Sequence, residues 1–472
     1  MDKSTELLDE LLIIVNKYLA GDRGHAGKVV DYLAPRDLKN NFNTQLGDGG
    51  CSAKELLRAL DEYLKYSVRT GSTNFYNQLY GGFEIAAFIG EVATALTNTS
   101  MYTYEVAPVA TLMEMELIKM MNGKAGFEDG SGIFCTGGSN ANMIALMCAR
   151  NMRFPGCQMK GMPVGVKPAL FISDQAHYSF RKAANILGIG QDRVIKVITD
   201  SRGRMAADEL EKAVIKSKDR GETPFFTAAT AGTTVLGAFD PVPQIADIAK
   251  KHNLWLHIDG AWGGPVLLSK KHRILLEGSE LADSFTWDAH KLMGVPLICT
   301  AFLTKHKNLL AQSCALEKQD TSYLFHENEE KDYNLGHNSL QCGRRVDSLK
   351  LWLLWKYIGT NGFEKRIDHL FDMAKYADSR VSLISKLESA GKPDFLNICF
   401  RYIPDNGEEI NSFNKKVREK MRKEGKIHVN YSQLNSQTYF RLVLSNPEVT
   451  KKDIDFFFNT LLKTGRELEK IN

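Results

Sequence analysis

The chain has 472 residues, which is enough for two or three domains of ordinary size. Hydrophobic residues make up 43% and charged residues 25%, which is ordinary for a folded protein and excludes a collagen-like or low-complexity chain. The 60 basic and 56 acidic residues are interspersed and leave a net charge of +4, so we expect no nucleic-acid partner.

The N-terminal residues show helical periodicity. Apolar side chains recur at helical spacing over 7–15 and again over 56–64. We therefore expect a helical segment over 1–60 that packs on the main domain or on a second subunit.

The middle of the chain alternates strand and helix patterns. Strands are predicted at 169–172, 194–198, 225–229, 254–258, 284–287 and 298–303, and the helices between them at 178–187, 206–215 and 241–252. Continuous apolar strands in this alternation are typical of an α/β domain with a mostly parallel sheet covered by helices on both faces. We assign this large domain to 61–345. Ligands of such sheets gather at the carboxyl ends of the strands.

The pattern changes after residue 345. Two long helices are predicted at 346–358 and 363–387, two strands at 396–402 and 439–444, and a last helix at 451–468. A separate, smaller α+β C-terminal domain over 346–472 is the simplest account.

Cysteine, histidine and apolar patterns limit the remaining classes. The eight cysteines form no C-x-x-C pair and the eleven histidines no H-E-x-x-H motif, so no metal site is predicted. The acidic N-terminus does not resemble a signal peptide, and no apolar run approaches the ~18 residues that span a bilayer. We expect a soluble, cytoplasmic protein in a reducing compartment, without a membrane partner.

Two predicted strands deliver unusual residues to their carboxyl ends. The strand at 254–258 leads to Asp259 and then to small residues over 260–264. The strand at 284–287 is followed by Lys291, which precedes two apolar residues. A lysine in such a setting is costly to bury unless it is neutral or used covalently.

A glycine-rich stretch at 130–142 forms the third element. It precedes a helix predicted at 143–151, and the free backbone N–H groups there, with the hydroxyls of Thr136 and Ser139, suit a phosphate group. The third glycine of the G-x-G-x-x-G pattern is replaced by Cys135, which disfavours a dinucleotide.

An acid, a lysine and a phosphate cradle on one α/β sheet suit pyridoxal phosphate (PLP). The lysine amine forms a Schiff base with the aldehyde, and the carboxylate pairs with the ring nitrogen. His177, which follows the strand at 169–172, is placed to lie over the cofactor ring. Each of these features considered alone also has a purely structural explanation. Asp259 could belong to a turn, Lys291 could be a surface lysine, His177 a structural histidine, and the glycines part of a tight turn.

With these residues in view, the chain resembles the group II PLP-dependent amino-acid decarboxylases, most closely the branch of glutamate and cysteine-sulfinate decarboxylases. The similarity runs from about residue 70 to the C-terminus. Besides the lysine region, it is carried by FYNQL at 75–79, YTYEVAP at 102–108, TAGTTVLGAFDP at 230–241, LQCGR at 340–344 and YFRLVLSNP at 439–447.

The resemblance implies a type I PLP-dependent transferase fold and a homodimer with active sites at the subunit interface. It also implies roles for individual residues. Lys291 matches the Schiff-base lysine, Asp259 the partner of the ring nitrogen and His177 the base stacked on the ring. Phosphate-side and other cofactor positions are matched by Thr136, Gly137, Gly138, Ser139, Thr233, Ala261, His290 and Gly343.

Three further matches concern the substrate. Tyr323 matches a loop tyrosine that protonates the substrate carbon after CO₂ leaves. Arg441 matches an arginine that binds the α-carboxylate, and Gln78 a contact to the side-chain carboxylate. An arginine fork suits a carboxylate and orients the bond to be cleaved.

The chain departs from the family pattern in ways that bear on the substrate. Asp288-Ala289 replaces the usual Asn-Pro before His-Lys and brings a carboxylate close to the lysine or the phosphate. Residues 72–74 replace the usual His-Pro, and Tyr80 stands where the glutamate enzymes have a small residue, which shortens the pocket.

The sequence therefore predicts a carboxy-lyase that decarboxylates an acidic L-amino acid: glutamate, aspartate or cysteine sulfinate. One alternative is another reaction on the same fold, with a basic or aromatic amino acid as substrate or an oxidation coupled to transamination. The other alternative is a PLP-binding dimeric scaffold without turnover.

Overall fold

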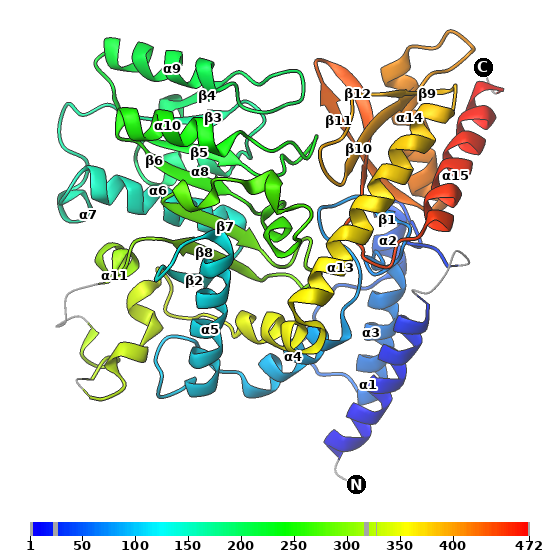
Figure 1. The fold of residues 1–472 in the computed structure, drawn as a ribbon. Coiled ribbons are helices and arrows are strands. Elements are labelled where there is room, and N and C mark those ends of the chain that lie inside the picture. Colours follow the sequence, from blue (N-terminus) through cyan, green and yellow to red (C-terminus); the bar gives the residue numbers. More distant parts are fainter. Residues whose placement is uncertain (1–2, 22–26, 316–320, 327, 471–472) are drawn as a thin grey trace. The chain divides into compact units, whose positions relative to one another are not determined.

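The computed structural model describes residues 3–21, 27–315, 321–326 and 328–470 (Figure 1). Its packing divides the chain into two compact units. The larger unit comprises 83–371 and 393–395, and the smaller unit comprises 1–82, 372–392 and 396–472. Each unit contains one β-sheet.

The larger unit is built on a seven-stranded sheet with the order β2-β8-β7-β6-β5-β3-β4. The strands are β2 (Ser131–Cys135), β3 (Pro168–Ser173), β4 (Val194–Val197), β5 (Thr223–Thr230), β6 (Trp255–Asp259), β7 (Ser284–Asp288) and β8 (Thr300–Thr304). Neighbouring strands from β4 to β7 pair in parallel, whereas β8 is antiparallel to both β2 and β7. The predicted mostly parallel sheet is therefore confirmed.

Helices cover this sheet and close its core. They are α4 (Ile85–Thr97), α5 (Pro108–Ala125), α6 (Gly138–Arg153), α7 (Cys157–Lys160), α8 (Ser179–Ile186), α9 (Ala207–Asp219), α10 (Val242–His252) and α11 (Leu309–Cys314). Helix α6 packs on α8 and lies against β5 to β8, and α9 packs on α10. Strand β3 is buried along its whole length, as a strand covered on both faces must be.

The smaller unit contains a five-stranded sheet with the order β1-β11-β12-β10-β9. Its strands are β1 (Phe75–Tyr76), β9 (Leu387–Ser389), β10 (Asn397–Tyr402), β11 (His428–Leu434) and β12 (Gln437–Val443). Its helices are α1 (Lys3–Ala20), α2 (Pro35–Asn41), α3 (Ala53–Tyr66), α14 (Ile410–Glu424) and α15 (Lys451–Glu469). Strand β1 pairs in parallel with β11, so a segment from early in the chain forms one edge of a sheet of C-terminal strands.

The two helices predicted at 346–358 and 363–387 are both present in α13 (Asp347–Leu383), which contains a kink between them. Gly359 interrupts the helix with φ 66° and ψ 175°, at the place where the two helices were expected to separate. The second helix ends at 383, before 387, because Leu387 pairs with Tyr402 in the β9–β10 ladder. Helix α13 continues from the larger unit into the smaller one.

Three further features were not anticipated from the sequence. The stretch at 130–142 is not all loop: it contains β2, and α6 begins at Gly138, five residues before the predicted start at 143. Strand β11 was missed, although the positive φ angles of Asn435 (49°) and Ser436 (65°) make the tight turn between β11 and β12. Helices α4 and α5 were not predicted either.

The packing units do not coincide with the domain limits at residues 60 and 345 predicted from the sequence. Residues 61–82 group with the C-terminal sheet because β1 belongs to it, and 346–371 group with the larger unit. Among the described residues, no helix is long and apolar enough to cross a membrane.

A buried ion pair joins four segments of the larger unit. Arg344 donates through NH1 to both carboxylate oxygens of Glu114, at 2.9 and 3.1 Å, and to the carbonyl of Phe134 at 3.0 Å. Its NH2 donates to the carbonyl of Met101 at 2.9 Å, and Glu114 accepts the N–H of Phe134 at 3.1 Å. The side chains of both charged residues are at most 4% exposed.

We predict that Glu114→Ala lowers the free energy of unfolding by about 3–5 kcal/mol, because it leaves a buried guanidinium without its counter-charge. Chemical denaturation of the cofactor-free protein measures the loss. Glu209→Ala on α9 is the matched control, since that carboxylate pairs with Lys212 on the surface and its removal should not move the midpoint. Equal losses in the two variants would contradict the prediction.

Candidate active site

Lys291 lies just beyond the carboxyl end of β7. Its Nζ is 3.0 Å from Oδ2 of Asp288, the last residue of that strand, and the lysine side chain is 21% exposed. The backbone N–H of Lys291 donates to the carbonyl of Asp288 at 3.2 Å and closes a turn. The lysine is therefore held at the edge of the sheet where ligands of parallel sheets bind.

Asp259 ends the neighbouring strand β6 and is 4% exposed. Its Oδ2 accepts a hydrogen bond from the amide nitrogen of Asn142 at 2.8 Å, and its Oδ1 accepts one from the N–H of Ala261 at 3.2 Å. Strands β6 and β7 pair in parallel, with Asp259 opposite Thr286. The carboxylate and the lysine therefore end adjacent strands at the same edge.

His177 belongs to the same group. It lies between β3 and α8, and its Nδ1 accepts the N–H of Ser179 at 3.3 Å. Burial lowers the pKa of His177, while the nearby Asp259 opposes that shift and Lys291 adds to it. The structure thus brings together the three residues predicted to serve the cofactor ring, from three different strand ends.

The predicted phosphate cradle is the start of α6. Gly137 precedes the helix with φ 103°, a conformation that favours glycine, and Gly138 is the first helical residue. The first N–H groups of a helix have no partner within the helix. A Cβ atom on Gly138 would lie 2.8 Å from Oδ2 of Asp288, so no side chain has room there. Thr136 and Ser139 flank this point and are both exposed.

His290 and Thr233 are buried residues that contact neighbouring residues of the larger unit. His290 is 7% exposed, with Nδ1 3.0 Å from the carbonyl of Cys299 and Nε2 3.7 Å from Oδ2 of Asp288. Burial lowers the pKa of His290, and Asp288 opposes the shift. Thr233 is fully buried, and its hydroxyl accepts the N–H of Ala238 at 3.0 Å, so it shapes the loop after β5.

A cavity of about 280 Å³ opens beside the cradle. Thr136 and Gly343 both line it, and the side-chain amide of Gln341 donates to the Thr136 hydroxyl at 3.3 Å. Residue 343 therefore lies near the phosphate-side residues, although about 200 residues separate them in sequence.

Gln78 and Arg441 belong to the smaller unit, where they are close to each other. Arg441 is in β12 and is 5% exposed, and its NH2 donates to the carbonyl of Asn77 at 2.8 Å. Gln78 follows directly and is half-buried. Burial lowers the pKa of the Arg441 guanidinium.

Tyr323 is a predicted site residue that also lies apart from the residues at the strand ends. Its side chain is 75% exposed in the segment 321–326, and residues 316–320 lie outside the described part of the chain. Its electrostatic neighbour is Tyr102, whose pKa is raised first by burial and then by Cys342 and Tyr323. The contacts of the described residues do not bring Tyr323 to Lys291.

A buried hydrogen-bond chain behind Asp259 was missed by sequence reasoning. Asn142 donates to Asp259, and its oxygen accepts the hydroxyl of Thr286 at 2.8 Å and faces Nε2 of His257 at 3.1 Å. Nδ1 of His257 lies 2.8 Å from the hydroxyl of Ser284. Since a carboxylate only accepts, the Asn142 amide nitrogen must face Asp259, and His257 must carry its proton on Nε2.

The sequence contained little indication of this series of side-chain hydrogen bonds. His257 stood in the predicted strand before Asp259 and Asn142 in the glycine-rich stretch, but nothing in the sequence linked them. Asn142 is 1% exposed and His257 is fully buried, so these hydrogen bonds lie in the interior of the larger unit. Their role is to hold the Asp259 carboxylate in one orientation.

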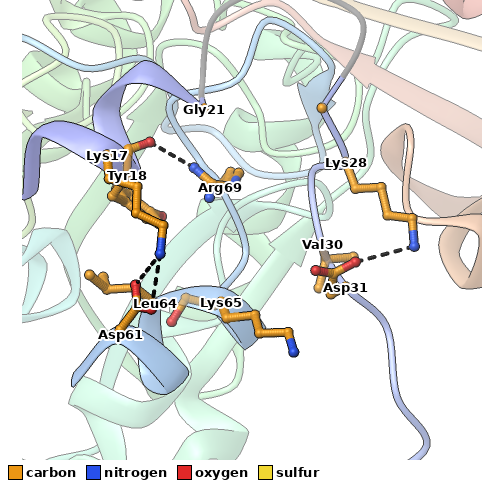
Figure 2. A pocket seen from close by; sticks show the side chains of 12 residues that line it. Lys17, Tyr18, Gly21, Lys28, Val30, Asp31, Asp61, Leu64, Lys65 and Arg69 are labelled. Atoms are coloured by element: carbon orange, nitrogen blue, oxygen red, sulfur yellow. Dashed lines mark hydrogen bonds and ion pairs between the residues drawn. The ribbon is translucent and has the colours of Figure 1, made fainter. Parts of the chain in front are cut away.

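The smaller unit has a pocket of about 340 Å³ that contains no predicted site residue (Figure 2). Figure 2 shows Lys17 directed at Asp61 and Lys28 at Asp31, with N···O distances of 3.0 and 3.2 Å. NH1 of Arg69 donates to the carbonyl of Tyr18 at 2.8 Å. These cations are engaged within the unit.

The comparisons with known proteins identify the family of this chain. The family model described as "Pyridoxal-dependent decarboxylase conserved domain" matches residues 35–403, and the chain belongs to this family. Human cysteine sulfinic acid decarboxylase is 39% identical over 469 residues, which cover 97% of this chain and 95% of the human protein.

Solved structures give the same result for the fold. The crystal structure of mouse CSAD is similar with a TM-score of 0.94 and 38% identity, over 98% of each chain. That of Oryza sativa TDC with PLP and tryptamine has a TM-score of 0.90 at 22% identity, over 99% of each chain, and speaks for the fold alone. The predictions of a type I fold, a PLP cofactor and a carboxy-lyase are therefore confirmed.

The residues present fit pyridoxal phosphate. A lysine reaches the edge of the sheet, a buried carboxylate with fixed orientation stands on the adjacent strand, and a helix begins at a glycine that admits no side chain. These are the three groups that the aldehyde, the ring nitrogen and the phosphate require.

The buried chain predicts a pH dependence of stability. Burial lowers the pKa of His257 to about 3, whereas an unfolded histidine titrates near its ordinary value of about 6.5. Between these pH values the unfolded chain binds a proton that the folded chain does not, so this stability is present above about pH 6.5 and is lost as the pH falls toward 3.

We expect His257→Gln, which stays neutral, to lose less unfolding free energy than the unchanged protein between about pH 7 and about pH 5. Denaturant titrations at both pH values test this. Parallel losses in the two proteins would show that His257 is not the group responsible.

Proposed function

We propose that this chain removes the α-carboxylate of an acidic L-amino acid as CO₂ and leaves the amine, and that it takes cysteine sulfinate in preference to glutamate or aspartate. The 39% identity with human cysteine sulfinic acid decarboxylase supports the substrate class. The observation that carries the reaction class is the grouping of Lys291, Asp259 and His177, which follow or end β7, β6 and β3 at the same edge of the sheet.

When bound, pyridoxal phosphate supplies an aldehyde for amines and a ring that takes up the electrons released at the substrate Cα. We expect Lys291 to hold it covalently between turnovers. Asp259, oriented by Asn142, would keep a proton on the ring nitrogen. His177 would pack on the ring, and the hydrogen-bond donors over 136–139 would hold the phosphate.

The remaining cofactor contacts are proposed at Thr233, Ala261, His290 and Gly343. Ala261 already bonds to Asp259 through its backbone, and Gly343 lines the cavity next to Thr136. His290 lies within 3.7 Å of Asp288 at the phosphate end.

Two residues of the smaller unit are proposed to bind the substrate. The guanidinium of Arg441 suits the α-carboxylate, because two parallel hydrogen bonds fix the plane of that group and the direction of the bond that breaks. Gln78 is proposed for the acidic group of the substrate side chain. The bond from Arg441 to the carbonyl of Asn77 supports a shared location for the two.

Tyr323 is proposed to return a proton to the substrate carbon after CO₂ leaves. Its exposed position suits a residue that acts in the active site of another subunit and not in that of its own chain. In a homodimer, that site belongs to the second copy.

A panel of amino acids tests the reaction. We expect cysteine sulfinate, glutamate and aspartate to release CO₂ and their amines, and tryptophan and lysine to remain unchanged.

We predict that Lys291→Ala abolishes turnover, and that Asp259→Asn lowers the rate by about 10²–10³, because the ring nitrogen loses its counter-charge. Lys305→Ala is the control, since that lysine pairs with Asp283 before β7 and should not matter.

Two results would contradict the proposal. Decarboxylation of only basic or aromatic amino acids would overturn the substrate class. A borohydride-trapped cofactor adduct with no loss of any amino acid would instead indicate a binding scaffold without turnover.

The proposed homodimer is supported by an apolar stripe on α4. Ile85, Ile89, Val92 and Leu96 recur every three or four residues along one face and are 44–80% exposed. On α5, Val109 is also exposed, at 67%. A stripe of this kind on a helix of the larger unit is typical of a surface that a second subunit covers.

We predict that the double change Ile89→Glu and Leu96→Glu converts the dimer to a monomer, because it places two charges in the apolar stripe. Analytical ultracentrifugation measures the mass. Ile215→Glu on α9 is the control, as Ile215 is 47% exposed but lies outside the stripe, and this variant should stay dimeric. A monomeric parent protein or a dimeric double variant would be the contrary result.

We also propose a cytoplasmic location. All eight cysteines are free thiols, and five of them are buried. Free thiols in this number suit a reducing compartment.

A further inference from the structure

A buried carboxylate stands between the predicted lysine and the predicted phosphate cradle. Asp288, the last residue of β7, is 1% exposed. Its Oδ2 is 3.0 Å from Nζ of Lys291 and would be 2.8 Å from a Cβ on Gly138. One oxygen therefore borders both the lysine and the first residue of α6.

The other oxygen is fixed from behind. Oδ1 of Asp288 accepts the hydroxyl of Thr300, in the neighbouring strand β8, at 2.7 Å. The two residues are opposite each other in the β7–β8 ladder, so the contact follows from the strand register. The carboxylate is held with Oδ2 directed toward the lysine and the helix.

The charge of Asp288 is felt by its neighbours. Nε2 of His290 is 3.7 Å from Oδ2, and Asp288 opposes the lowering of the pKa of both His290 and His177 that burial causes. Its carboxylate contacts in the described residues are with side chains, Thr300, Lys291 and His290, and not with the backbone of a turn. The Asp288 carboxylate is therefore placed to interact with the side chains around Lys291.

The family resemblance described above implies asparagine at this position, where this chain has aspartate. An asparagine has the same shape but no charge. The aspartate of this chain supplies a counter-charge to the ammonium of Lys291, and it places a negative charge next to the start of α6, where a phosphate is expected. Like charges at short range in a buried place repel strongly.

We propose that Asp288 is a positioning residue that pairs with Lys291 while the cofactor is away and repels the phosphate of the cofactor when it is bound, so that this chain releases and exchanges pyridoxal phosphate readily. This inference rests on the proposed function, because it takes Lys291 as the lysine that holds the cofactor.

Cofactor exchange in the Asp288→Asn variant tests the proposal. The holoenzyme is mixed with an excess of a scavenging apoenzyme, and the release of pyridoxal phosphate is followed by visible absorbance. We expect release from Asp288→Asn to be about tenfold slower than from the unchanged protein, since the repulsion is gone. Asp288→Ala should shift release in the same direction, which separates charge from shape.

Pyridoxal, which lacks the phosphate, is the second probe. Asp288→Asn should strengthen the binding of pyridoxal phosphate more than that of pyridoxal, because only the former is repelled. The matched control is Asp283→Asn: Asp283 precedes β7, at the opposite end of the strand from Asp288, and its carboxylate lies 2.9 Å from Nε2 of His306. This variant should leave both ligands unchanged.

Unchanged or faster release from Asp288→Asn overturns the proposal, as does an equal gain for pyridoxal and pyridoxal phosphate. Thermal unfolding of the cofactor-free variants verifies that they fold. Borohydride reduction and peptide mapping keep the two proposals apart. An adduct on another lysine refutes the proposed function, whereas an adduct on Lys291 without slower release refutes only the role of Asp288.

Discussion

Parallel hydrogen bonding between β6 and β7 places the ends of these two strands side by side, and with them the two groups on which the proposed chemistry depends. Asp259 ends β6 opposite Thr286 in β7, and Lys291 follows the end of β7 by three residues. Both strands are buried along their length, so the ladder fixes the backbone that carries Asp259 and the strand end from which Lys291 follows. The chain of side chains from Ser284 through His257 to Asn142 adds a second restraint on Asp259.

The sequence predicted the central strands well because they are continuous apolar runs between turn residues. It also singled out Asp259 and Lys291, since a charge at the end of an apolar strand is hard to explain as core. It did not locate the start of α6, where Ser139, Asn140 and Asn142 are weak helix formers and the helix is held by packing on the sheet. Only tertiary structure decides such a boundary.

Long-range partners were out of reach. Asn142 and Asp259 are 117 residues apart in the sequence, and neither residue type predicts that the other is its partner. The two-residue strand β1 is recognisable only through its pairing with β11, and that pairing places Gln78 in the unit that contains Arg441. The site roles of these residues came from family resemblance, and the contact of Arg441 with Asn77 gives them a common place.

The cysteines beside the cradle have a chemical consequence. Burial raises the pKa of the Cys135 and Cys299 thiols, and Asp288 raises both further. A protonated thiol is a poor nucleophile and reacts slowly with peroxides and alkylating agents. Oxidants and alkylating agents should therefore act slowly on Cys135 and Cys299, whereas the exposed Cys342, next to Gly343, has no such protection.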